Sequence, residues 1–317
     1  MSAKAIRKLA YVHIGYEEDA AADGHSIFDS RVISELSRLD LQLECVAVQR
    51  RRGLRAPFWA CPVDSSVVTR LRQYASRGYA LIVSHEALFS LAGSCKVDTL
   101  IVHNDFTRFS YPGKPALTAY YRIGSRGYYL RACRRARRLI FLGVTDYRSL
   151  HALLGQDGVS NSSVMQPPPR HVNIDSRAGD LVHISSSKAW LPKRLGTLTA
   201  RQGDYIGARG FRLAELSGSN QSGNGLITDR FDVGFKLQLM QMLYTRDVIA
   251  SLVDLESEVR ELAPEYPCYR TVVNLPEALD YFDSWRGRVP ESDLLQSTAS
   301  LRHLAWPDYV KSLVRSV

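Results

Sequence analysis

With 317 residues, the chain is long for one domain and sufficient for two that each bury a core. Hydrophobic residues make up 45% and charged residues 23% of it, as in an ordinary soluble globular protein. No apolar run approaches the roughly 18 residues of a membrane span, and five cysteines without CxxC spacing argue against a disulfide framework or a zinc site. We therefore expect a cytoplasmic protein.

The first half of the chain alternates strands with helices. A buried strand is predicted at residues 8–16, and a helix follows from about Ile27 to Leu39 because its apolar residues share one face. Further strands are predicted at 43–48, 79–84, 99–103 and 138–143, and further helices at 65–76, 117–136 and 145–154. This alternation is typical of a doubly wound α/β domain.

The net charge of +9 lies wholly in residues 1–165, which contain 23 Lys+Arg and 14 Asp+Glu against 18 of each in the remainder. Much of it falls in the predicted helix 117–136, where arginines alternate with tyrosines. Such a segment can bind an anionic membrane surface or nucleic acid, and a solvated helix face is the alternative. The candidate membrane-binding residues are Arg134, Arg135, Arg137 and Arg138. Nucleic acid is the weaker option because no recognised binding motif accompanies the charge.

Three consecutive prolines, Pro167–Pro169, interrupt the alternation and indicate a domain boundary. We predict domains at residues 1–166 and 167–300, followed by a C-terminal segment 301–317 that holds a helix near Trp306–Val314. The second domain is expected to begin with a strand at 180–184. Residues 218–225, rich in Gly, Ser and Asn, are expected to form a flexible loop, with few elements between Gln202 and Leu226.

Residues 226–251 predict a strand, a loop, a helix and a second buried strand. In such a βαβ unit the loop lies at the carboxyl end of the first strand, where open α/β sheets bind ligands. The free N–H groups of the helix start and the charges of Arg230 and Lys236 favour an anion such as a diphosphate. A structural turn with two solvated basic residues is the alternative.

Two α/β domains with this loop in the second resemble the GT-B glycosyltransferases, and in particular family 4. Residues 226–251 are similar to the donor-site signature of that family, and His103-Asn104-Asp105 is similar to the His-Asn or His-Asp motif of its first domain. The helix near Trp306 resembles the one that crosses back onto the first domain. The resemblance implies two Rossmann-like domains facing each other across a cleft.

The resemblance also implies residue roles on the donor side. The candidate donor-binding residues are Lys188, Asp229, Arg230, Gly234, Phe235, Lys236 and Gln241. Basic side chains and helix N-termini would stabilise the leaving diphosphate, so neither a metal nor another cofactor is expected. Where the family has a Glu-x₇-Glu pair, this chain has Val233 and Gln241, and Gln241 retains the ability to hydrogen-bond a ribose hydroxyl.

On the acceptor side, the candidate catalytic residues are Asp105, His103 and Asp23, and the candidate acceptor-binding residues are Gly24 and His25. The resemblance makes His103 a donor-sugar contact and Asp105 a possible base. A core histidine and a helix-capping aspartate are the alternatives. The expected function is transfer of a sugar from a nucleotide-diphosphate donor to a saccharide or polyprenyl-linked acceptor, at the inner face of the cell membrane. A non-catalytic GT-B-like partner protein is the competing interpretation.

Overall fold

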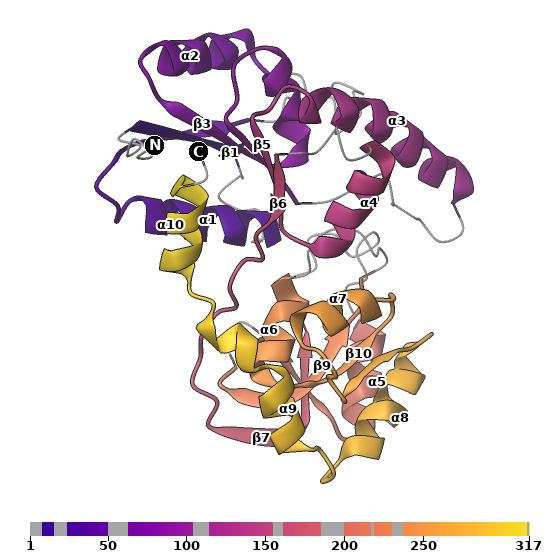
Figure 1. Ribbon diagram of the computed structural model, residues 1–317. Helices are drawn as coiled ribbons and strands as arrows, with labels where there is room; N and C mark the ends of the chain where they lie inside the picture. The colour runs from indigo at the N-terminus through magenta and orange to yellow at the C-terminus, as the bar shows by residue number, and fades with distance from the viewer. Residues whose placement is uncertain are drawn as a thin grey trace.

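Two parallel sheets, one in each half of the chain, organise the fold (Figure 1). The computed structural model describes residues 8–15, 24–49, 63–103, 114–154, 161–184, 200–216, 219–229, 237–315 and 317. Because every strand pair in these sheets is parallel, neighbouring strands are joined by crossover connections. The predicted α/β class is confirmed.

The first sheet has the strand order β2-β1-β3-β4-β5-β6. Its strands are β1 (Lys8–Ile14), β2 (Gln42–Val48), β3 (Ala80–Ser84), β4 (Thr99–Val102), β5 (Arg138–Phe141) and β6 (Ser162–Val164). The helical segments are α1 (Gly24–Leu36), α2 (Ser65–Ser76), η2 (Glu86–Gly93), α3 (Pro115–Cys133) and α4 (Val144–Leu154). The predicted elements are found with small shifts of their ends. The sequence reading missed the short strand β6 and the 3₁₀ segment η2.

The second sheet has the strand order β11-β10-β9-β7-β8. Its strands are β7 (Ser176–Ile184), β8 (Arg212–Glu215), β9 (Gln221–Ile227), β10 (Val248–Ser251) and β11 (Tyr269–Thr271). The helical segments are α5 (Ala200–Ala208), α6 (Leu237–Thr245), α7 (Glu256–Leu262), α8 (Leu275–Trp285), α9 (Glu291–Ser297) and η5 (Ala299–His303). Most of helix α5 and all of strand β8 lie between Gln202 and Leu226, so the expectation of few elements there was wrong.

The expected flexible loop at 218–225 was also wrong, because residues 221–225 belong to strand β9. Packing explains why glycines occupy this strand. A Cβ on Gly223 would lie 2.7 Å from the Leu181 carbonyl oxygen, and one on Gly225 would lie 2.6 Å from Met242 Sδ. Here glycine permits close approach of backbone and side chains, and composition alone cannot distinguish that role from flexibility.

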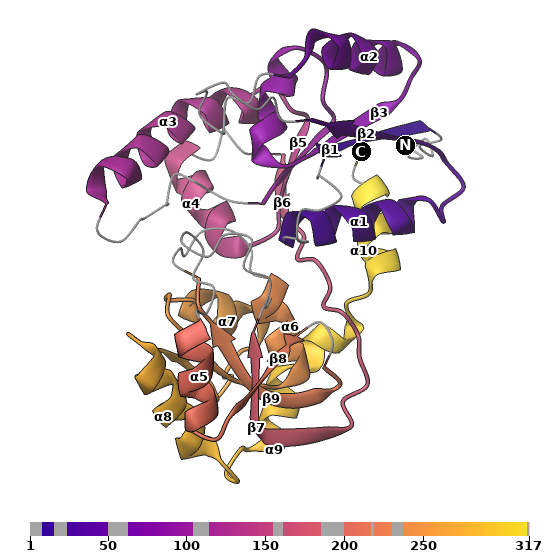
Figure 2. The ribbon, with the colours of Figure 1, turned by 180° about the vertical axis from the view of Figure 1, so that it is seen from behind.

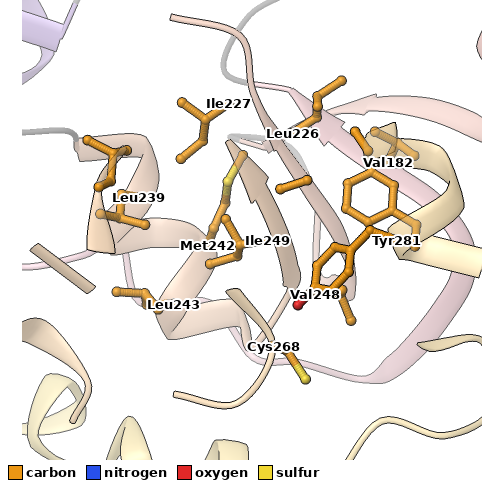
Figure 3. Close-up of a cluster of buried hydrophobic side chains, with 14 of the residues drawn as sticks. Val182, Leu226, Ile227, Leu239, Met242, Leu243, Val248, Ile249, Cys268 and Tyr281 are labelled. Atoms are coloured by element: carbon orange, nitrogen blue, oxygen red, sulfur yellow. The ribbon is translucent and has the colours of Figure 1, made fainter. Parts of the chain in front are cut away.

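The unit β9-α6-β10 forms as predicted, with β10 parallel to β9 in the register Val248↔Asn224 to Ser251↔Ile227. Figure 3 shows Met242 of α6 lying against Ile249 of β10 in the core of the second domain. On α6, the five residues 239–243 and Thr245 are all buried. The helix is therefore fixed by packing, and its start is held at the carboxyl end of β9.

The two sheets share one topology. Counted within each domain, the strands follow the order 2-1-3-4-5, with a sixth strand added in the first domain. In this doubly wound arrangement the chain reverses direction across the sheet between strands 1 and 3, and ligands bind outside the carboxyl ends at that switch point. The switch points here lie between β1 and β3 and between β7 and β9.

The carboxyl ends of the two sheets face each other. Helix α4 begins directly after β5 and helix α7 shortly after β10, and their first turns meet where Thr145 Oγ1 lies 3.4 Å from Ser257 Oγ. Because both residues follow the ends of strands, this contact brings the two carboxyl edges together. Figure 2 shows α7 and α6 at the end of the second domain that faces the first.

The last helix, α10 (Trp306–Arg315), returns from the second domain to the first and lies beside α1 (Figures 1 and 2). Tyr309, Val310 and Leu313 are buried in the same cluster as Leu9 and Phe28 of the first domain. The C-terminal crossover helix of the predicted fold is confirmed. It packs on the first domain because its apolar residues recur at helical spacing on one face.

Candidate functional site

A buried hydrogen-bond network ends at the carboxyl edge of the first sheet. Tyr11 of β1 donates its hydroxyl hydrogen to Asp29 Oδ1 at 2.6 Å, and Ser84 at the end of β3 donates to the same oxygen at 2.6 Å. His103, the first residue after β4, places Nε2 2.9 Å from Ser84 Oγ. These four side chains lie at or below 4% exposure. The network therefore links α1 to three strands around the first switch point.

The proton positions in this network follow from its chemistry. Burial raises the pKa of the Tyr11 phenol well above its ordinary value, and the Asp29 carboxylate raises it further. Tyr11 therefore stays protonated and donates to Asp29 at neutral pH. Short hydrogen bonds from two hydroxyls are typical of an ionised carboxylate acceptor. Asp29 thus accepts two buried hydroxyl hydrogen bonds close to His103.

Aromatic rings surround His103. The ring of Phe28 meets it edge-on at a centroid distance of 4.9 Å, and Phe28 in turn contacts Trp306 and Tyr309 of the crossover helix. His85, which follows β3, stacks on His103 at 6.0 Å and has a φ of 92°. A positive φ is uncommon for a residue other than glycine and is often found at functional sites. The C-terminal helix thus completes the environment of a first-domain histidine.

In the second domain, two chain segments follow the strands on either side of the switch point. Residues 185–199 follow β7 and residues 230–236 follow β9, and both lie outside the described residues. They contain Lys188, Arg230, Gly234, Phe235 and Lys236. The last described residue before the second segment, Asp229, accepts a hydrogen bond from Gln238 Nε2 of α6 at 2.9 Å. This bond ties the start of the donor loop to the first turn of the helix beyond it.

Helix α6 also holds the connection between the domains. Gln241 Oε1 accepts a hydrogen bond from the Arg170 backbone N–H at 2.7 Å, and the Tyr244 hydroxyl lies 3.1 Å from His171 Nδ1. The other nitrogen of His171, Nε2, donates to the Leu304 carbonyl, two residues before α10. Both passages of the chain between the domains are therefore attached to the helix that starts at the candidate donor loop. The predicted donor contact of Gln241 stays a prediction.

Other predicted site residues divide into two groups. Gly24 and His25 open helix α1, which also carries Asp29. Asp23 and Asp105 lie outside the described residues. The alternative of a core histidine fits the burial of His103, yet its position at a strand end beside the switch point is also what a site residue requires. The roles assigned to these residues stay predictions.

The basic segment of the first domain presents arginines on the surface of α3. The chain has nine basic and no acidic residues between Asp105 and Asp146. Arg134 and Arg135, at the end of α3, are exposed. Arg137 instead pairs with Asp98 at 3.2 Å, and Arg138 donates to Ser163 Oγ at 3.0 Å. Two of the four candidate membrane-binding residues thus have structural partners within the domain.

The described residues include neither a candidate membrane span nor a candidate metal site. None of their helices is long and apolar enough to span a bilayer. Likewise, no group of three or more His, Cys, Asp or Glu among the residues that the structure describes could hold a metal ion. The described cysteines Cys45, Cys95 and Cys268 are free thiols.

Sequence reasoning missed Tyr11, Asp29 and Ser84. Tyr11 and Ser84 lie in runs that read as buried strands, and Asp29 lies within a predicted helix. The available signal was Asp29, because it lies on the helical face that also carries the apolar residues Phe28 and Val32. A carboxylate on a buried face needs hydrogen-bond donors from neighbouring elements.

Comparison with known proteins supports the architecture. No family model and no curated protein matches the sequence. Among solved structures, the chain is similar to an α,α-trehalose-phosphate synthase (UDP-forming) from Burkholderia vietnamiensis, with a TM-score of 0.56, 11% identity, and coverage of 98% of this chain and 96% of that one. It is also similar to a UDP-glucosyltransferase from Polygonum tinctorium capable of glucosylating indoxyl, with a TM-score of 0.56, 7% identity and 99% coverage of both chains.

A third similar structure is TarM, with a TM-score of 0.50 and 10% identity. The match covers 78% of this chain and 57% of the TarM chain, so this chain spans little more than half of TarM. At such identities the likeness establishes the fold alone. The chain has the GT-B architecture of two Rossmann-like domains.

Proposed function

We propose that the protein is a glycosyltransferase that moves a sugar from a nucleoside-diphosphate donor to a saccharide or lipid-linked saccharide acceptor. The observation that carries the proposal is the pairing of two switch points at facing carboxyl edges. One has the buried His103 network, and the other is flanked by two segments that hold Lys188, Arg230 and Lys236. An anionic donor would bind near the basic segments of the second domain. The acceptor hydroxyl would lie near His103 of the first domain, where a side chain can take up its proton.

The proposed mechanism uses the two domains differently. Arg230, Lys236 and the N-terminus of α6 would stabilise the charge that develops on the leaving diphosphate. His103 or Asp105 would orient the sugar or take the proton of the acceptor hydroxyl. Since basic side chains perform the role of a metal in this scheme, we expect transfer to persist in EDTA. Assignment to family 4 and a role in polysaccharide synthesis belong to the same proposal.

Nucleotide binding is the first test. Saturating UDP, GDP or dTDP at about 100 times its Kd should stabilise the protein by about 2.7 kcal/mol and raise Tm measurably. Arg230→Ala and Lys236→Ala should each weaken binding roughly tenfold to a hundredfold, because each removes a charge-assisted contact to phosphate. Differential scanning fluorimetry across a nucleotide titration measures both effects.

Arg209→Ala serves as the matched control for this titration. Arg209 pairs with Asp280 and Asp283 and lies between the end of α5 and the start of β8, away from the carboxyl ends of the strands, so its removal should leave nucleotide affinity unchanged. A protein that responds to no nucleotide, or variants that bind as tightly as the wild type, would contradict the proposal. The first result would favour a non-catalytic partner protein. That interpretation also agrees with the position of Gln241, which stands where the family has a glutamate and accepts a hydrogen bond from the Arg170 backbone.

We further propose that the end of α3 docks on an anionic membrane where a lipid-linked acceptor is presented. Each basic residue near such a surface contributes about 1 kcal/mol. The double variant Arg134→Glu/Arg135→Glu should therefore weaken binding to phosphatidylglycerol-containing vesicles at least tenfold, measured by cosedimentation at fixed ionic strength.

Arg260→Glu on α7 is the control for vesicle binding, since Arg260 is exposed on the second domain and pairs only with the neighbouring Glu256 among its described contacts. Equal binding by the double variant and the wild type would reject membrane docking at this surface. Retained vesicle binding with lost affinity for duplex DNA would assign the arginines to nucleic acid instead.

A further inference from the structure

We propose that His171 is a positioning residue that joins both passages of the chain between the domains to helix α6 and so sets how the two domains face each other. The first passage, residues 165–175, connects β6 to β7, and the second, residues 304 and 305, connects η5 to α10. Figures 1 and 2 show both passages on the same side of the molecule. The His171 bridge follows from contacts between described residues, and its effect on sugar transfer rests on the proposed function.

The first passage is stiff where it leaves the first domain. The Met165 backbone N–H donates to the Phe141 carbonyl of β5 at 2.8 Å, which fixes the passage to the first sheet at this point. Residues 167–169 are buried prolines, whose rings restrict their own backbone and that of the residue before them. The chain therefore bends little over these residues, and a movement of the first domain is transmitted to Arg170 and His171.

Helix α6 holds the two residues that follow the prolines. Gln241 Oε1 accepts from the Arg170 backbone N–H at 2.7 Å, and the Tyr244 hydroxyl lies 3.1 Å from His171 Nδ1. Gln241 and Tyr244 are three positions apart and so lie on one face of the helix. The ring of His171 also meets that of Tyr244 edge-on at a centroid distance of 5.0 Å. Because most of α6 is buried in the core of the second domain, these contacts attach the passage to a rigid element.

An imidazole can join three segments because its two nitrogens point in different directions. Nε2 of His171 lies within hydrogen-bond distance of the Leu304 carbonyl oxygen. A carbonyl oxygen only accepts, so Nε2 carries the hydrogen and Nδ1 accepts from the Tyr244 hydroxyl. Leu304 lies two residues before α10, whose Tyr309 and Val310 are buried in the core of the first domain. One side chain thus connects α6, the first passage and the start of the crossover helix.

The contacts on the side of α4 and α7 are weaker by comparison. There the hydroxyls of Thr145 and Ser257 lie 3.4 Å apart and are exposed to water. A hydrogen bond of this kind contributes little net stability, because water replaces it when it opens. The orientation of the domains therefore depends mainly on the two passages. Without His171 the second passage is no longer joined to α6, so the domains should vary in orientation while each stays folded.

Hydrogen–deuterium exchange of the nucleotide-free, full-length protein tests the bridge without reference to activity. His171→Ala should speed amide exchange about tenfold in both passages, at residues 170–175 and at residues 302–306, because the loss of its hydrogen bonds shifts local opening by about that factor. Small-angle X-ray scattering should show a broader distribution of interatomic distances. Tyr244→Phe, which keeps the ring and loses the hydroxyl, should give a smaller increase in exchange.

His303→Ala is the matched control. His303 is exposed, directly precedes Leu304, and makes no hydrogen bond or ion pair among the described residues. Its removal should leave exchange at residues 170–175 unchanged. His171→Gln, whose amide N–H can reach the Leu304 carbonyl, should retain slow exchange in the second passage, and thermal unfolding confirms that each variant is folded. Unchanged exchange of the second passage in His171→Ala, or an equal increase of the first passage in His303→Ala, would overturn the proposal.

Activity separates this inference from the proposed function. His171→Ala should lower kcat about 10- to 100-fold, because transfer needs both domains in register and a displacement of about 1 Å has an effect of this size. Nucleotide Kd should stay unchanged, since the candidate phosphate contacts all belong to the second domain. Faster exchange with an unchanged kcat would overturn the role in orienting the domains. Should the wild-type protein show no transferase activity while His171→Ala still speeds exchange in both passages, the proposed function fails and the His171 bridge is supported.

Discussion

Replacing Asp247 by alanine is expected to destabilise the protein by about 2–6 kcal/mol, because the change removes the acceptor of two buried hydrogen bonds. Asp247 and His183 are both fully buried, with His183 Nδ1 2.6 Å from Asp247 Oδ2. The second oxygen, Oδ1, accepts from the Gly223 backbone N–H at 2.8 Å. Alanine would leave both donors without an acceptor in a region that water cannot reach, and each such group costs about 1–3 kcal/mol.

The magnitude can be tested against a surface pair on the same sheet. Asp180 and Arg212 lie 2.6 Å apart, but their side chains are 42% and 65% exposed. Asp180→Ala should therefore cost about 0.2–1 kcal/mol. Urea unfolding of both variants gives the comparison, with Asp247→Asn as a milder isostere that can still accept one hydrogen bond. A loss at Asp247→Ala no larger than that at Asp180→Ala would refute the assignment.

The position of this pair predicts which property it changes. Asp247 directly precedes β10, and His183, the last residue but one of β7, is level through Gly225 of β9 with Ile249, the second residue of β10, so the Asp247 carboxylate lies at the amino end of β10. Nucleotide affinity at a temperature where Asp247→Ala remains folded should equal that of the wild type. This geometry gives His183 a structural role.

The fold was largely predictable because its parallel strands are buried on both faces. Strands such as Leu81–Val83 and Val248–Ala250 form short apolar runs, and helices between them show a helical repeat of apolar residues. Both properties depend on neighbours in the sequence. The unit around α6 could be read correctly for this reason, even though its loop lies outside the described residues.

The His103 network was not predictable for the opposite reason. Its contacts join residues 18, 55 and 19 positions apart, from α1, β1, β3 and the end of β4. Strand order places these elements side by side, and a single sequence does not state the order. A histidine at a strand end was recognisable, whereas the serine and aspartate that orient it depend on β1 and β3 being neighbours.

Strand β9 shows a second limit of sequence reading. Glycine-rich segments are usually loops, and the run from Gly218 to Gly225 has that composition. In the structure, Ser222, Gly223, Asn224 and Gly225 are buried within the sheet. Asn224 Nδ2 donates to the backbone carbonyls of Gly179 and Leu181, which lie in the bulged part of β7. The sequence around Asn224 does not show that the neighbouring strand has a bulge.

Gly223→Ala is accordingly expected to destabilise the protein by about 1–3 kcal/mol or more, the cost of overpacking. The register between β7 and β9 shifts between Arg177 and Val182, and Gly223 lies opposite this bulge. An added Cβ would lie 2.7 Å from the Leu181 carbonyl oxygen and 3.2 Å from Leu181 Cβ. A backbone oxygen cannot rotate away, so one of the two strands must shift.

A shift of β9 would also move the loop that follows it. Gly223 donates its N–H to Asp247 and accepts from Arg177 through its carbonyl, so displacement would weaken both contacts. The carboxyl end of β9 leads through Asp229 into the segment with Arg230 and Lys236. We therefore expect Gly223→Ala to weaken nucleotide binding as well as stability, in contrast to Asp247→Ala, whose cost lies in unpaired donors and not in a forced displacement.

Two other glycines calibrate the experiment. Gly225→Ala should cost less than Gly223→Ala, because the atom in its way, Met242 Sδ at 2.6 Å, belongs to a flexible side chain. Gly127→Ala, in the exposed helix α3 with nothing within 4 Å of the added Cβ, should instead stabilise the protein by about 0.5–1 kcal/mol. Urea unfolding and nucleotide titration of the three variants test this order. If Gly223→Ala were as stable as the wild type, the close approach of β9 to the β7 bulge would be disproved, and with it the reason that glycine occupies a buried strand.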